Sequence, residues 1–182
     1  MSNLLRRALK ISITPAILMI AGKFLGLLII NIIYDFNFQI DNDLQGIFSV
    51  QLYYTDQTTT LFANSISNLI MILTIALPLV YFVAKTLFYQ KALNNPRTIV
   101  KMTKLNVNKW ITKDDSSFLK IFIWSCFLWL SSMVTISHSI QGITYEYIAI
   151  IAVILTILTT WGAVKTFESE TDKIYPRDKK YI

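Results

Sequence analysis

Lys23 is the residue whose type and position most strongly suggest chemistry in this chain. It lies near the middle of residues 14–34, an apolar run that is long enough to cross a bilayer. A charged side chain at this depth is costly, and it indicates a functional role unless the charge reaches the membrane surface. Lys23 could hold an anionic substrate, pair with a carboxylate of a partner span or relay protons. Its long side chain could instead snorkel toward the inner surface of the membrane, and we favour this interpretation.

Two glycines beside Lys23 suggest a close helix contact. Gly22 and Gly26 have the spacing of small residues that let two membrane helices approach each other, either within the chain or with a partner. Glycine at this spacing also occurs in membrane helices that make no such contact. The sequence leaves both interpretations open.

Two asparagines are the best polar candidates in the other apolar runs. Asn64 and Asn68 lie one helical turn apart in residues 61–84, on the same face as Ser67 and Met71. Polar residues on one face usually hydrogen-bond to neighbouring helices, and a substrate-lined cavity is the alternative. The candidate residues for helix packing or partner contact are therefore Gly22, Lys23, Gly26, Asn64 and Asn68.

No motif in the sequence indicates a catalytic or metal site. Cys126 is the single cysteine and His138 is the single histidine, so neither makes a metal site unaided. The motifs HExxH, GxxxxGK[ST], GxSxG and CxxC do not occur. We therefore expect no cofactor and no metal, and we favour a non-catalytic protein over a membrane enzyme.

Four apolar runs must position these residues. The chain has 182 residues, of which 54% are hydrophobic and 15% are charged, and soluble domains carry about 25% charged residues. The runs cover residues 14–34, 61–84, 118–137 and 147–164, and none of them contains Asp or Glu. Between them lie an outer loop (35–60) and an inner loop (85–117), and an inner tail (165–182) follows. The expected fold is all-α: a single membrane domain forming a four-helix transmembrane bundle.

The distribution of charge predicts how the chain is threaded. Of the seventeen Lys and Arg residues, every one except Lys23 lies in the N-terminal segment, the inner loop with the start of the third run, or the tail. The outer segments carry acidic residues and no Lys or Arg. Because cytoplasmic segments are enriched in Lys and Arg, we expect both termini and a basic loop on the cytoplasmic side. We expect the cell (inner or plasma) membrane, with an organelle inner membrane as the alternative.

The loops allow three further predictions. The helix of the second run should continue into the cytoplasm as far as Asn94, Asn95 and Pro96, which favour a turn. In the outer loop, residues 44–54 suggest a short interfacial helix or an irregular cap. The inner loop mixes basic and apolar residues and should lie on the anionic inner leaflet, through Arg97, Lys101, Lys104, Lys109 and Trp110.

These features favour a non-catalytic integral membrane subunit or accessory protein of a larger membrane complex. The alternative is a small oligomeric transporter or channel that uses Lys23 and the face of Asn64 and Asn68. The expected partners are anionic lipids of the inner leaflet and other membrane subunits or further copies of this chain. The Lys and Arg residues that produce the net charge of +6 flank the apolar runs and do not form one patch. We therefore expect no nucleic acid partner.

Overall fold

Four long helices make up most of the structure, a computed structural model that describes residues 3–34, 38–40, 52–54, 56–93 and 117–174. The helices are α1 (Asn3–Tyr34), α2 (Gln57–Leu93), α4 (Ser117–Ile140) and α5 (Glu146–Ile174). Each contains a stretch that is long and apolar enough to cross a membrane. This confirms the prediction of a multi-pass, helical membrane protein with four spans.

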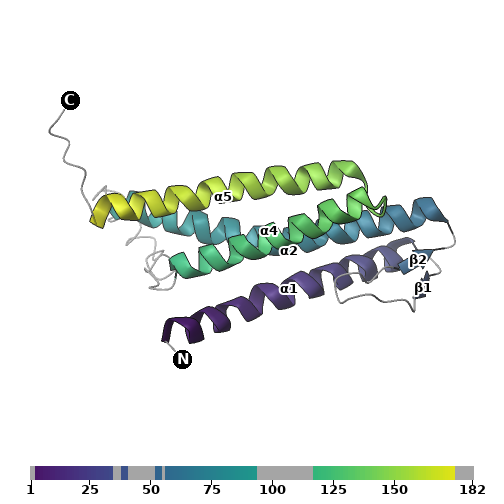
Figure 1. Cartoon of the computed structure of the whole chain (residues 1–182), viewed down its shortest axis with the longest axis horizontal. Helices are drawn as coiled ribbons and strands as arrows, with labels where there is room; N and C mark the ends of the chain where they lie inside the picture. The colour runs from purple at the N-terminus through teal and green to yellow at the C-terminus, as the bar shows by residue number, and fades with distance from the viewer. Residues whose placement is uncertain (1–2, 35–37, 41–51, 55, 94–116, 175–182) are drawn as a thin grey trace.

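The helices run back and forth along one long axis (Figure 1). The beginning of α1 and the end of α5 lie at one end of the molecule, which we call the terminal end. The end of α1, the beginning of α2 and the turn between α4 and α5 lie at the opposite end, which we call the strand end. Helix α2 packs against α1, α4 and α5, so it is the central element of the described structure.

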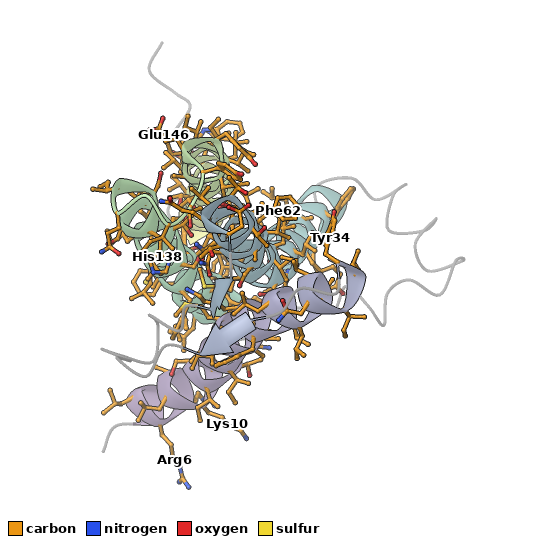
Figure 2. The ribbon with its side chains drawn as sticks, turned by 90° about the vertical axis from the view of Figure 1, so that its right-hand side faces the viewer. Arg6, Lys10, Tyr34, Phe62, His138 and Glu146 are labelled. Carbon is orange, nitrogen blue, oxygen red and sulfur yellow. The ribbon has the colours of Figure 1, made fainter. Side chains whose placement is uncertain are left out.

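Helix α1 is inclined to the others. Figure 2 looks along the bundle from the strand end, and α1 crosses this view obliquely, with Arg6 and Lys10 pointing away from the other helices. At the strand end, the rings of Tyr34 and Phe62 pack edge to face with 5.4 Å between their centroids. This contact joins the last turn of α1 to the first turns of α2.

Both ends of α2 follow from the local sequence. Asp56 precedes the helix, and its carboxylate accepts hydrogen bonds from the hydroxyl and the backbone N–H of Thr58. The Thr58 hydroxyl is the largest cause of a lowered pKa of the Asp56 carboxyl, which acts as the N-cap. Pro78 lies inside the helix, which continues to Leu93, directly before Asn94. The predicted extension of this helix into the inner segment is therefore present.

A tight turn joins α4 to α5 at residues 141–145. The N–H of Ile143 donates to the carbonyl of His138 at 2.9 Å, and the N–H of Gly142 donates to that of Ser139 at 3.0 Å. Gly142 has a positive φ of 71°, which a glycine adopts without steric cost. These two bonds form a Schellman motif, which ends α4 and makes the last two helices antiparallel neighbours, as predicted.

A small antiparallel hairpin lies at the strand end. It consists of β1 (Phe38–Ile40) and β2 (Leu52–Tyr54), with Phe38 opposite Tyr54 in the register. The short helix or irregular cap predicted for residues 44–54 is therefore wrong at its end, where the backbone is extended. Residues 44–51 lie outside the described ranges. At residues 52–54, backbone pairing with β1 outweighed the weak helical pattern of this segment.

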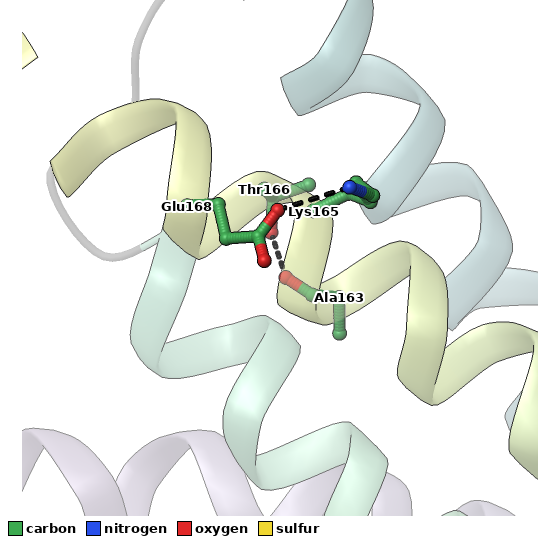
Figure 3. A network of polar contacts seen from close by, with 4 residues as sticks. All are labelled: Ala163, Lys165, Thr166 and Glu168. Atoms are coloured by element: carbon green, nitrogen blue, oxygen red, sulfur yellow. Dashed lines mark hydrogen bonds and ion pairs between the residues drawn. The ribbon is translucent and has the colours of Figure 1, made fainter. Parts of the chain in front are cut away.

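The apolar core lies along the middle of α2 and toward the terminal end. Ile72, Ile75 and Leu79 of α2 are fully buried and pack with Ile121 and Trp124 of α4. Lys165 and Glu168, toward the terminal end of α5, have exposed side chains in contrast. Figure 3 shows the Lys165 ammonium 3.1 Å from the Glu168 carboxylate there, and an exposed pair of this kind adds little stability.

Candidate functional site

The crossing of α1 and α2 depends on the two glycines beside Lys23. A Cβ atom added to Gly26 would lie 2.6 Å from the Cα of Ser67, and one added to Gly22 would lie 3.1 Å from the Cα of Met71. The two backbones can therefore approach this closely only with glycine at these positions. The Ser67 hydroxyl donates to the carbonyl oxygen of Lys23 at 2.7 Å across the same contact. The structure thus uses Gly22 and Gly26 in a contact within the chain.

Lys23 is buried beside this contact. Its side chain is 6% exposed, which goes against the snorkelling interpretation. The physical reason is the rotation of α1 about its axis. Lys23 follows Gly22 directly and lies three residues before Gly26, so a helix that presents both glycines to α2 also turns Lys23 inward.

Asn68 joins three elements of the strand end. Its amide nitrogen lies 3.2 Å from Nδ1 of His138 and donates to the hydroxyl of Thr144 at 2.6 Å. His138 comes from α4, and Thr144 comes from the turn before α5. Asn68 is fully buried, and His138 and Thr144 are 6% and 2% exposed. One amide group therefore holds the end of α4 and the following turn against α2.

Asn64 is buried without using its hydrogen-bonding capacity. It lies one turn before Asn68 and is 2% exposed, yet neither its amide nitrogen nor its amide oxygen has a hydrogen-bond partner among the described residues. The amide oxygen of Asn68 also lacks a partner in this part of the chain. Buried polar atoms are nearly always hydrogen-bonded to protein or ordered water. These three atoms therefore have hydrogen-bonding capacity that no described residue uses.

The turn between α4 and α5 closes this region toward the strand end. The backbone N–H of Tyr145 donates to the hydroxyl of Ser65 at 2.8 Å. Together with the bond from Asn68 to Thr144, it fixes the turn over the polar part of α2. Tyr145 also stacks on Tyr147, with 5.2 Å between the ring centroids. The polar residues are thus covered by a turn that is itself hydrogen-bonded to α2.

We define the polar cluster as the buried residues that share this region: Lys23, Asn64, Ser67, Asn68, His138 and Thr144. All of them except Thr144 lie on helices α1, α2 and α4 within the candidate membrane spans. The cluster holds one positively charged side chain, one imidazole and several neutral donors and acceptors. Such a set can bind a small solute or ordered water, and it offers no activated nucleophile.

The remaining predicted residues lie elsewhere. The residues expected to contact inner-leaflet lipid all fall in the segment 94–116, outside the described ranges: Arg97, Lys101, Lys104, Lys109 and Trp110. Cys126 is exposed on α4. No group of three His, Cys, Asp or Glu side chains that could hold a metal ion occurs among the described residues.

His138 and Thr144 of the polar cluster, and the neighbouring Ser65, were not predicted as site residues. Their contribution depends on how α4 and the following turn meet α2, which no local pattern specifies. One signal was present in the sequence. His138 directly follows the third apolar run, and Gly142 predicts a tight turn that would bring residues after it back toward the bundle.

Comparison with known proteins gives no family for this chain. No family model, no curated protein and no solved structure matches it.

Proposed function

We propose that this chain is a small membrane protein that binds a solute inside its own bundle, as a small transporter or channel does. The polar cluster is the observation that carries the proposal. It combines Lys23 and the face of Asn64 and Asn68, the residues on which the transporter hypothesis depends, in one buried region. The proposed assembly is an oligomer of this chain, because four helices provide little surface to enclose a pathway alone.

The energetic cost of the cluster supports this proposal. An unsatisfied polar group within a membrane costs several kcal/mol, because lipid cannot supply a hydrogen bond. Three buried amide atoms of Asn64 and Asn68 have no partner among the described residues, beside a charged Lys23. Well-packed apolar residues would stabilise the bundle better at these positions. A bound solute, with its water, provides the missing hydrogen bonds.

The subunit hypothesis now depends on other surfaces. Gly22 and Gly26 contact α2 of the same chain, and Lys23 is buried inside it, so these residues offer less to a partner's span. The exposed apolar side chains of α1, among them Ile17 and Leu28, remain available to lipid or to another membrane protein. Identification of the proteins that co-elute in mild detergent separates the two functions, because a fixed heteromeric complex supports a subunit.

We further propose that both termini lie in the cytoplasm and that the membrane is the cell membrane. The basic N-terminal segment, inner loop and tail support this orientation. Cysteine introduced at Gly142 should then react in intact cells with an impermeant thiol reagent, in a background lacking Cys126. Cysteine introduced at Asn106 should not react, and the reverse pattern would overturn this orientation.

A flux assay tests the proposed function. The full-length protein is reconstituted in liposomes, and swelling is followed by light scattering after mixing with iso-osmotic chloride, formate, urea or glycerol. We expect at least one solute to enter faster than in protein-free liposomes, and the Asn64→Leu/Asn68→Leu double variant to lose this increase. Cys126→Ser, on the exposed face of α4, is the matched control and should keep it. Liposomes no more permeable than protein-free ones to all four solutes would contradict the proposal.

A further inference from the structure

We propose that the beginning of α1 binds an anionic phospholipid in the leaflet at the terminal end. Arg6, Arg7 and Lys10 hold the phosphate group of this lipid, and exposed apolar side chains beside them hold one of its acyl chains. The site lies outside the polar cluster, so it goes beyond the proposed function and does not depend on it. It also lies on a different segment from the lipid contact that the sequence predicts for the inner loop.

The first turns of α1 carry three positive charges that form no ion pair in the described structure. Arg6, Arg7 and Lys10 have exposed side chains, and Figure 2 shows Arg6 and Lys10 pointing away from the other helices. None of the three pairs with a described acidic residue, and α1 itself contains no Asp or Glu. Lys10 lies four residues after Arg6 and three after Arg7, the spacings at which helical side chains are neighbours. These groups therefore favour a phosphate, to which arginine and lysine form charge-assisted hydrogen bonds.

An exposed apolar row begins beside these charges and continues along α1 toward the strand end. The apolar row consists of Leu5, Leu9, Ile13 and Ile17, which are 47%, 50%, 57% and 60% exposed. Each lies four residues after the one before it, so all four share one side of the helix. Because Leu5 and Leu9 directly precede Arg6 and Lys10, the apolar row runs next to the basic residues. An acyl chain that packs along the row brings its phosphate to the basic residues.

The length of α1 places both features at the depth that a phospholipid requires. With 32 residues, the helix is about 48 Å long at 1.5 Å per residue, longer than a hydrocarbon core of about 30 Å. Tyr34, at the end of α1, is an aromatic residue of the kind enriched at membrane boundaries. Counted back from it, the roughly 20 residues that cross the core reach Pro15. The basic residues then lie at the level of the headgroups, and the apolar row leads from there into the core.

Lys165 of α5 shows what a basic side chain at the terminal end looks like when it is already paired. Its ammonium lies 3.1 Å from the Glu168 carboxylate, and both side chains are exposed. The nearby carboxylate offsets its charge and competes with a lipid phosphate. Lys165 should therefore contribute little to the binding of an anionic lipid, and it provides a matched control for Lys10.

Native mass spectrometry of the purified full-length protein in detergent tests the proposal, because it measures the affinity for the first bound lipid. Dioleoylphosphatidylglycerol is compared with dioleoylphosphatidylcholine, which has the same acyl chains and no net charge. We expect the anionic lipid to bind at least fivefold more tightly. Lys10→Gln should weaken its binding about fivefold and Arg6→Gln/Lys10→Gln about thirtyfold, the effect of roughly one basic residue at a time at a membrane surface. Lys165→Gln should change the affinity less than twofold, and Lys10→Arg should keep most of it.

Three results would overturn the proposal. The first is equal affinity of the wild type for the two lipids. The second is an equal loss in Lys10→Gln and Lys165→Gln, since this would indicate attraction to the overall charge and not to α1. The third is displacement of the lipid by an equal concentration of glycerol 3-phosphate, which would mean that the apolar row holds no acyl chain. Circular dichroism in detergent without added lipid verifies that the variants, all on exposed positions, have the helical content of the wild type.

Discussion

The two halves of α2 bury their inward faces with different kinds of side chain. Toward the strand end, the buried face is mostly polar and consists of Asn64, Ser65, Ser67 and Asn68 together with Ala63. Toward the terminal end, it is apolar and consists of Met71, Ile72, Ile75, Ala76, Leu79 and Val83. The neighbours differ too. Gly26 of α1 approaches the polar half at Ser67, and Gly22 approaches Met71 at the border of the two halves. Larger apolar side chains of α1 and α4 fill the space around the rest of the apolar half.

The two halves of α2 differ in how their side chains contribute to the stability of the bundle. From Met71 to Val83, α2 is joined to its neighbours mainly by apolar packing, together with a hydrogen bond from the Thr74 hydroxyl to the carbonyl of Leu18. The polar half places amide groups where some of their atoms have no partner in the described structure. Buried polar atoms without a partner are expected at a site that serves function at the expense of stability. The comparison therefore predicts that replacing the unpartnered amide of Asn64 is tolerated, whereas truncating a buried apolar side chain destabilises the bundle.

The largest effect is expected where α1 approaches the polar half. Gly26→Ala would place a Cβ atom 2.6 Å from the Cα of Ser67, so the two helix backbones must separate. We expect a loss of about 3 kcal/mol in the free energy of unfolding, the upper end of the range for overpacking. Titration with SDS in mixed micelles measures this loss. Gly162→Ala is the matched control, because its Cβ would meet only the end of the Val83 side chain at 3.1 Å. A smaller loss for Gly26→Ala than for Gly162→Ala would refute the close contact.

A smaller loss is expected from a cavity in the apolar half. Ile75 is fully buried in the core, and Ile75→Ala removes packing that the surrounding helices cannot fully replace. We expect a loss of roughly 2 kcal/mol, the low end of the range for soluble cores, because lipid is as apolar as the core itself. The same SDS titration applies. The exposed Leu77, two residues further along α2, provides the control, and Leu77→Ala should change stability much less.

The smallest effect, with the opposite sign, is expected in the polar half. Asn64→Leu removes two amide atoms that have no partner in the described structure, so stability should stay the same or rise by up to about 1 kcal/mol. Asn68→Leu should instead destabilise by about 1 kcal/mol, because His138 and Thr144 lose their shared partner. Equal losses for the two variants would mean that Asn64 is as well bonded as Asn68, and the comparison between the halves of α2 would no longer hold.

Much of the fold could be predicted from the sequence, because membrane spans depend on length and composition. The four spans and the extension of α2 to Leu93 needed only apolar runs and the turn-forming residues after them. The burial of Lys23 could not be predicted in this way. It depends on the rotation of α1, which is set by packing of Gly22 and Gly26 against α2. If Gly22, Lys23 and Gly26 had been considered together as one helix face, burial of Lys23 would have been favoured over snorkelling.

The candidate site was harder to predict than the spans because it is assembled from distant parts of the chain. Asn64 and Asn68 could be recognised as one face of a helix, since that relation is local. The bonds from Asn68 to His138 and Thr144 join residues about seventy positions apart. They arise from the contact of α2 with α4 and from the turn at Gly142, and the periodicity of one helix contains no information about either.

The division of the polar cluster between two helix pairs affects how this protein enters its membrane. Lys23, Asn64 and Asn68 belong to the first pair, whereas His138 and Thr144 belong to the second, which is synthesised later. A lysine at the centre of a lone helix costs about 2.5–3.5 kcal/mol on insertion. Until α4 and its turn are made, the amide of Asn68 faces lipid or the insertion machinery without these partners. The first pair alone therefore lacks two partners of Asn68, and a chain ending near Leu93 should form a less stable helix pair than the same helices in the full chain.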